Sequence, residues 1–272
     1  MKHVLLNIII ITNTELIQIF NNLILDLKIK FININIKIIN INELDDLNFN
    51  SNSKIDKKFR NGFWHLCSLR LIYLFSYIKK YNIENCIHIE NDVLCYENFQ
   101  FLEDKFVEKK IYATFDAQNR VIPGIIFIPN YLAFLPIIQN YNNSLNDMEN
   151  LAQHDENVII PFPIFTNFIE NNKYTKNFNT FSAIFDAAAM GQYLGGVDNR
   201  NIDGDTRGFI NETCVIKYNN YKFYWIKSNN LYKPYILINL KLIPIINLHI
   251  HSKLLQYFLS DNPVENKFIN FI

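Results

Sequence analysis

The chain has 272 residues, of which 49% are hydrophobic and 19% are charged, a composition typical of folded globular proteins and not of disordered ones. Its 26 basic and 26 acidic residues cancel, so it lacks the positive excess that a general nucleic-acid-binding protein needs. The four cysteines form no CxxC pair, and no apolar run reaches the roughly 20 residues that span a bilayer. We therefore expect a soluble, cytoplasmic protein without a transmembrane segment or a nucleic-acid partner.

The first half of the chain alternates between predicted strands and predicted helices. Short apolar runs rich in β-branched residues are typical of buried strands, and apolar residues at a spacing of three and four are typical of helices. The alternation predicts an α/β fold with three layers and a mostly parallel central sheet. Strands are predicted at Val4–Ile11, Phe31–Ile41, Cys86–Ile89, Ile111–Phe115 and Ile125–Ile128, and helices at Leu16–Leu27, Phe63–Lys80, Leu132–Tyr141 and Met148–His154.

The second half is predicted to be more irregular and to end in strands. No repeat and no linker rich in Gly, Pro or Ser interrupts it, so a single domain over residues 1–272 is expected. We predict helices at Asp186–Leu194 and Leu254–Leu259, and strands at Tyr221–Trp225, Ile236–Leu240 and Ile243–His249.

Two acids, Glu90 and Asp92, follow the predicted strand Cys86–Ile89 directly. Alternate side chains of an extended chain share a face, so the two carboxylates can converge on one hard cation such as Mn²⁺ or Mg²⁺. The carboxyl end of a strand is also where open α/β sheets bind their ligands. The alternative is a solvated strand end without a ligand.

Arg70 lies on an apolar face of the predicted helix Phe63–Lys80. An unpaired guanidinium is very costly to bury, so it must reach solvent or meet an anion. An internal salt bridge and a contact to a phosphate or nucleotide are both open at this point.

The segment Phe181–Asn211 holds five of the seven glycines and many polar residues. Asp186 is expected to cap the helix that follows it, to serve as the general base for a sugar hydroxyl, or to do both. Gln192, Asp198 and Arg200 are polar enough to hydrogen-bond a sugar. Asp147, Glu149, Asp155 and Glu156 are alternative bases, although solvated charge on a polar helix face is the usual explanation for such residues.

His249, His251 and Lys253 point the same way if the chain is extended there. Two imidazoles and an ammonium group on one face are expected opposite acids, a metal or a phosphate. A mildly basic strand end is the alternative.

The runs GFWHLCSLRLIYL, CIHIENDVLCY, FDAAAMGQYLGGVDNRN and NLHIHSK together resemble a family of GT-A-type glycosyltransferases of bacteria and large DNA viruses. The resemblance covers roughly residues 59–255. It implies a GT-A-like, Rossmann-type α/β/α sandwich in which residues 1–130 bind a nucleotide-sugar and residues 131–272 bind the acceptor and close the site. The activity implied is sugar transfer from a UDP- or GDP-sugar to a hydroxyl of a glycan or another acceptor.

The resemblance also implies roles for individual residues. Glu90 and Asp92 would form the DxD-type pair that holds a divalent metal, with Glu90 where that motif has its first Asp, and His251 or His249 would complete the ligands. Arg70, Asn91, Gln192, Asp198 and Lys253 would contact the donor, with Lys253 on the diphosphate. The alternative functions are a noncatalytic nucleotide-sugar-binding module and a metal-dependent nucleotidyltransferase or phosphohydrolase.

Overall fold

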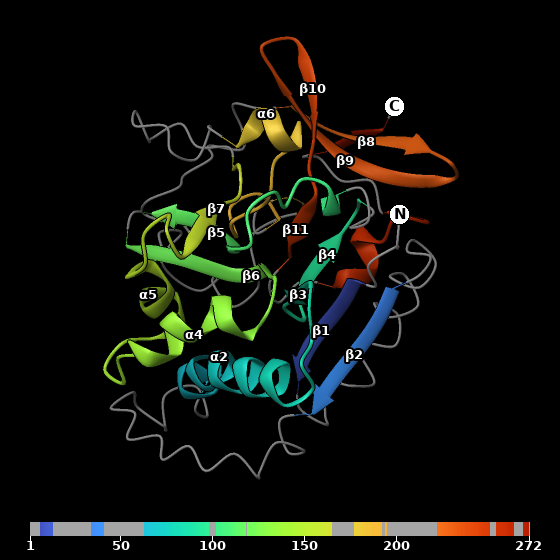
Figure 1. The fold of residues 1–272 in the computed structure, drawn as a ribbon. Coiled ribbons are helices and arrows are strands. Elements are labelled where there is room, and N and C mark those ends of the chain that lie inside the picture. The colour runs from blue at the N-terminus through green and yellow to red at the C-terminus, as the bar shows by residue number, and fades with distance from the viewer. Residues whose placement is uncertain are drawn as a thin grey trace, which may run out of the picture.

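A six-stranded mixed sheet forms the centre of the computed structural model (Figure 1), which describes residues 6–12, 34–40, 63–97, 102–117, 119–164, 177–191, 194, 222–250, 254–263 and 269–271. The strand order is β2-β1-β3-β6-β5-β7. The strands are β1 (Leu6–Thr12), β2 (Ile34–Asn40), β3 (Cys86–Ile89), β5 (Ile111–Ala117), β6 (Arg120–Ile128) and β7 (Ile159–Pro161).

Strand β6 runs antiparallel to both of its neighbours, β3 and β5. The other pairs, β1–β2, β1–β3 and β5–β7, are parallel. The reversal follows from the short connection between β5 and β6, because a hairpin can join only antiparallel strands. All four residues of β3 are buried, as expected for a strand covered on both faces.

The strand predicted at Ile125–Ile128 begins earlier than expected, at Arg120, so Pro123 lies inside β6. The register between β5 and β6 shifts at this point, since Ala113 pairs with Ile126 whereas Thr114 pairs with Ile122. The extra residues of β6 form a bulge. Proline has no N–H to donate to a ladder, and a bulge is one of the few places in a sheet that tolerates it.

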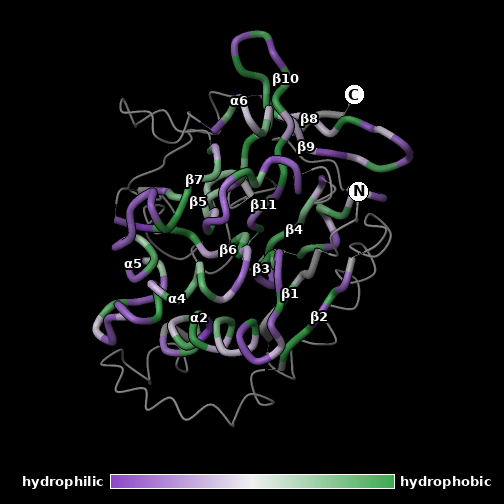
Figure 2. The backbone as a smooth tube through the Cα atoms, viewed as in Figure 1, coloured by the Kyte–Doolittle hydropathy of each residue, from purple (hydrophilic) through white to green (hydrophobic). Residues whose placement is uncertain are grey.

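Three helices, α2 (Phe63–Lys80), α4 (Tyr131–Gln139) and α5 (Asp147–Ala152), lie together beside the sheet (Figure 1). Helix α2 packs against α4 and α5, and α5 packs against β6. The predicted bounds of α2 are confirmed, and its residues Leu71, Leu74 and Ile78 are fully buried, one turn apart on a single face. Hydrophobic residues gather along the central strands (Figure 2).

A second sheet has the order β10-β9-β8-β12, and a two-stranded sheet joins β11 to β4. The single strand predicted at Ile243–His249 is therefore wrong, because the chain divides it between β10 and β11. The apolar residues predict that the whole segment is buried, but they do not show that its first part pairs with β9 and its last part with β4. The bounds are β4 (Val93–Cys95), β8 (Lys222–Ser228), β9 (Leu231–Ile238), β10 (Lys241–Pro244), β11 (Asn247–His249) and β12 (Ile269–Phe271).

The ends of two other predicted elements differ from the structure. The strand predicted to end at Leu240 ends at Ile238, because Asn239 and Leu240 form a turn in which both have positive φ. The last predicted helix is a single 3₁₀ turn, η6 (Leu255–Phe258). A short helix α6 (Phe178–Phe181), which was not predicted, precedes the loop that begins at Ser182.

The coarse class is confirmed: helices and a mixed sheet with parallel strands make an α/β fold, in which strands outnumber helices in the part of the chain described. The finer GT-A-like three-layer sandwich stays a prediction. The helix predicted at Leu16–Leu27 lies outside the described residues. None of the helices seen here is both long and apolar enough to pass through a membrane.

Candidate metal centre

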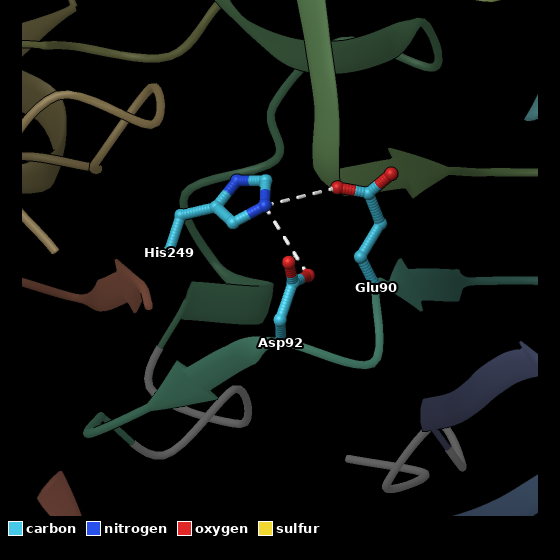
Figure 3. Close-up of side chains that lie close together, drawn as sticks. All are labelled: Glu90, Asp92 and His249. Carbon is cyan, nitrogen blue, oxygen red and sulfur yellow. Dashed lines mark ion pairs between the residues drawn. The ribbon is translucent and has the colours of Figure 1, made fainter. Parts of the chain in front are cut away.

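Glu90, Asp92 and His249 meet at the end of β3 (Figure 3), and one ligand atom from each lies within 4.8 Å of the others. The Nε2 atom of His249 is 3.2 Å from Asp92 Oδ1 and 3.4 Å from Glu90 Oε2. The side chains of His249 and Glu90 are 7% and 13% exposed, whereas that of Asp92 is 36% exposed. The three residues make a mostly buried cluster, most exposed at Asp92, that could hold a metal ion.

The backbone explains how residues so far apart in sequence meet. After β3 the chain makes a tight turn in which Val93 N donates to Glu90 O at 3.2 Å. Strand β11 then pairs antiparallel with β4, placing His249 opposite Val93. One residue further on, Ile250 N donates to Asp92 O at 2.8 Å. The short β4–β11 ladder therefore sets the imidazole beside the two acids.

Gly124, in the bulged part of β6, contacts both ends of the cluster. Its carbonyl accepts a hydrogen bond from Glu90 N at 2.9 Å. A Cβ placed on Gly124 would lie 2.8 Å from His249 Nδ1, closer than real Cβ atoms approach. A glycine at this position therefore leaves the space that the imidazole occupies.

We expect Gly124→Ala to weaken Mn²⁺ binding and to lower the free energy of unfolding by about 1–3 kcal/mol, because the methyl group pushes the imidazole out of place. Calorimetric titration with Mn²⁺ and denaturant unfolding measure the two effects. In a His249→Ala background the clash is removed, so the stability cost of Gly124→Ala should shrink. An equal cost in both backgrounds would contradict this explanation.

The electrostatics of the cluster follow from burial and from its carboxylates. Burial lowers the pKa of His249, but Asp92 and Glu90 outweigh it and raise the pKa to about 9. Burial raises the pKa of Glu90, opposed by the charges of Arg70 and His249. Without a cation, the imidazole is therefore protonated at neutral pH and balances part of the negative charge.

This shift predicts opposite pH trends for stability and metal affinity. The folded pKa of His249 exceeds the ordinary value of 6.5, so its contribution to stability is complete below pH 6.5 and is lost as the pH rises toward 9. A ligand must be neutral, so Mn²⁺ affinity should rise about tenfold per pH unit over the same window. Metal-free unfolding and Mn²⁺ titration between pH 6 and 9.5 measure both trends. A His249→Gln protein whose metal-free stability keeps the same pH profile would refute the assignment.

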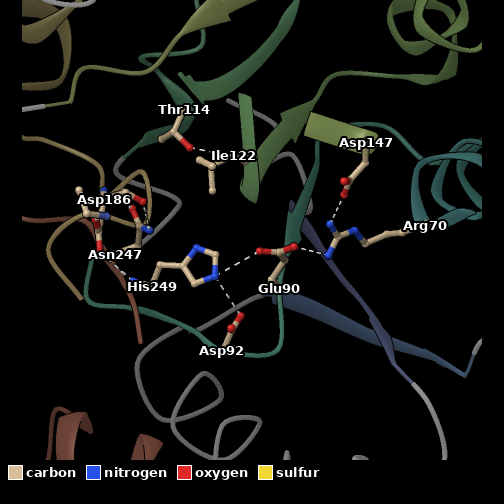
Figure 4. Close-up of polar contacts among 10 residues, drawn as sticks. Arg70, Glu90, Asp92, Thr114, Ile122, Asp147, Asp186, Asn247 and His249 are labelled. Atoms are coloured by element: carbon tan, nitrogen blue, oxygen red, sulfur yellow. Dashed lines mark hydrogen bonds and ion pairs between the residues drawn. The ribbon is translucent and has the colours of Figure 1, made fainter. Parts of the chain in front are cut away.

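Arg70 reaches the cluster from α2 and bonds two carboxylates at once (Figure 4). Its Nη1 donates to Glu90 Oε1, and its Nη2 donates to Asp147 Oδ2. Burial lowers the pKa of Arg70, but the negative charges of Glu90 and Asp147 raise it by more, so the net shift is upward and the guanidinium stays charged. Of the two alternatives that the sequence analysis gave for Arg70, the structure therefore contains the internal salt bridge. A contact between Arg70 and the donor stays a prediction.

Asp186 is almost fully buried and accepts four backbone N–H groups. Its Oδ1 accepts from Ala189 and Met190 at 2.7 and 2.8 Å. Its Oδ2 accepts from Gly191 and His249 at 2.7 and 2.9 Å. The carboxylate thereby holds the 186–191 loop against β11, beside the candidate metal ligand His249.

The helix predicted at Asp186–Leu194 is wrong over the described residues, which form bends and a turn. Ala188 has a positive φ of 58°, which an α-helix cannot contain. Asp186 therefore bonds N–H groups as a cap would, but no helix follows it. Its role as a general base stays a prediction that these contacts do not support, since each oxygen already accepts two donors.

The remaining predicted residues divide into two groups. Asn91 lies half-buried in the turn between the two acids. Gln192, Asp198, Arg200, His251 and Lys253 lie outside the described residues. Of the two candidate histidines, His249 is described and lies beside the acids.

Three residues of the site were missed or misread in the sequence. Asp147, read there as a solvated charge on a helix face, is 1% exposed and pairs with Arg70. Asn247 exchanges two hydrogen bonds with the backbone of Asp186, and it shares strand parity with His249, which is the signal that could have found it. Gly124 could have been noticed as a glycine next to a proline within a strand of a glycine-poor chain.

Comparison with known proteins gave no protein-family model that matches the chain and no similar curated protein. The function has therefore to be inferred from the chemistry of the site.

Proposed function

We propose that the protein is a metal-dependent glycosyltransferase that moves a sugar from a nucleotide-diphosphate sugar to a hydroxyl acceptor. The observation that carries the proposal is the convergence of Glu90, Asp92 and His249, about 160 positions apart, at the carboxyl end of a central strand. This is the place where open α/β sheets bind nucleotides and similar ligands. The acids-then-histidine order is also what the sequence resemblance implies.

The residues fit a divalent cation. Three carboxylates, Glu90, Asp92 and Asp147, and the Arg70 guanidinium leave a net charge of −2 when His249 is neutral, which one divalent cation balances. Carboxylate oxygens suit Mg²⁺ and Mn²⁺, and an imidazole nitrogen favours the transition metal of the two. We therefore expect Mn²⁺ to bind more tightly than Mg²⁺.

Each residue would have a distinct part in the reaction. Glu90, Asp92 and neutral His249 would hold the cation, which when bound would act as a Lewis acid toward the diphosphate of the donor. Lys253 would add a positive charge beside the leaving diphosphate. The base for the acceptor hydroxyl is not assigned to any of the described residues.

Incubation of the full chain with Mn²⁺ and a panel of UDP-, GDP- and dTDP-sugars tests the proposal. Release of a nucleoside diphosphate that depends on metal supports it. Tight donor binding without turnover would indicate a binding module instead, and release of pyrophosphate would indicate a nucleotidyltransferase. Asp104→Asn, which removes an exposed carboxylate elsewhere in the chain, serves as the control for Asp92→Asn.

A further inference from the structure

We propose that Arg70 and Asp147 are positioning residues that hold the carboxylate of Glu90 in the orientation needed to bind the metal. The inference rests on the metal site of the proposed function and adds to it two residues that are not metal ligands themselves. It is drawn from the ion pairs of Arg70 and from the way the two oxygens of Glu90 are used.

The two carboxylate oxygens of Glu90 face different partners. Oε1 accepts from Arg70 Nη1, and Oε2 lies 3.4 Å from His249 Nε2, on the side of the metal cluster (Figure 4). A glutamate has three rotatable bonds, and a partly buried one next to Asp92 would turn away from that negative charge if nothing held it. The bond to Arg70 fixes one oxygen and so directs the other at the cluster.

Asp147 in turn fixes the guanidinium. It is the first residue of α5, and its Oδ2 accepts from Arg70 Nη2. Helix α5 is held in place by a capping box between Asn146 and Glu149 and by packing against β6. The planar fork of an arginine can bond two carboxylates in fixed directions, which a lysine ammonium cannot do. The linked ion pairs Asp147–Arg70 and Arg70–Glu90 therefore hold the side chain of Glu90 in a fixed position relative to α2 and α5.

Two variants separate this role from a general contribution to folding. Arg70→Lys keeps the buried positive charge but loses the fork, and Asp147→Asn removes the anchor and one negative charge. Glu149→Gln is the matched control, since it removes a charge from the same helix without touching Arg70, and the side-chain carbonyl of glutamine can still accept from Asn146 N and keep the capping box. Each is titrated with Mn²⁺ alone by calorimetry, and each is melted with and without Mn²⁺.

We expect the Kd for Mn²⁺ to rise about 10- to 100-fold in Arg70→Lys and Asp147→Asn, and to stay unchanged in Glu149→Gln. The rise in Tm on adding Mn²⁺, measured from each variant's own metal-free Tm, should shrink in the first two. The electron paramagnetic resonance spectrum of bound Mn²⁺ should also change, because one ligand is less well ordered. If Asp147→Asn fails to fold, Arg70→Lys decides alone.

A lowered metal-free Tm with an unchanged Mn²⁺ affinity and spectrum would overturn the proposal, because it would show that the two residues only stabilise the fold. The proposed function fails in a different way. If the unaltered protein binds no Mn²⁺, the metal site itself is wrong, whereas equal binding by all variants leaves the metal site intact and refutes only the positioning role.

Discussion

Replacing Asp92 with Asn is expected to weaken Mn²⁺ binding at least about 100-fold and to abolish metal-dependent release of nucleoside diphosphate. Asp92 is the most exposed of the three candidate ligands. An amide oxygen is a much poorer ligand than a carboxylate, and the substitution also removes one unit of negative charge. Calorimetric titration with Mn²⁺ and a turnover assay measure the two losses.

The fold should tolerate this change, since the hydrogen bond that ties Asp92 to Ile250 uses the backbone carbonyl. Asp92→Asn should therefore still fold, with a metal-free Tm lowered modestly at neutral pH because its ion pair with protonated His249 is lost, and Asp104→Asn should keep both the Tm and the metal affinity. Unchanged Mn²⁺ binding by Asp92→Asn would show that the cluster is not the metal site.

Replacing Asp186 with Ala is expected to lower the free energy of unfolding by about 4 kcal/mol or more. The four N–H groups that its carboxylate accepts would be left buried without an acceptor, and each such group costs about 1–3 kcal/mol. Denaturant unfolding at neutral pH measures the change. A loss below about 1 kcal/mol would show that the loop finds other acceptors and that Asp186 does not hold it.

Asp104→Ala is the control for the loss of a carboxylate and should change stability by less than about 0.5 kcal/mol. The metal site should report the same event, because one of the four donors is the backbone of His249. We therefore expect Asp186→Ala protein that still folds to bind Mn²⁺ more weakly, through a displaced β11.

The sequence pattern predicted elements well where one face of a segment decides its structure. Helix α2 has the predicted bounds because its apolar residues recur at helical spacing over five turns, and β3 has them because a short apolar run with isoleucines is typical of a buried central strand. The pair Glu90 and Asp92 was predicted for the same local reason, since it follows β3 directly.

Features that depend on residues far away in the sequence could not be predicted from the local pattern. Strand parity could not choose between His249 and His251, and it is the register of β11 on β4 that sets His249 beside the acids. The burial of Asp147 depends on Arg70, 77 residues earlier in the chain. The loop after Asp186 is not a helix, since Ala188 has a positive φ, and the carboxylate of Asp186 bonds the backbone of His249 in β11, 63 residues away.

Because the β4–β11 ladder brings the candidate ligands together, metal binding would depend on the folded state. Its strands close a loop of about 150 residues, and by the chain-entropy estimate such a closure costs about 5 kcal/mol. The unfolded chain would therefore rarely bring the three candidate ligands together, and we expect Mn²⁺ to bind mainly the native state. By mass action, Mn²⁺ at 100 times its Kd would add about 2.7 kcal/mol to the free energy of unfolding. The cation would act as a reversible cross-link between the middle and the end of the chain, and chelation would release it.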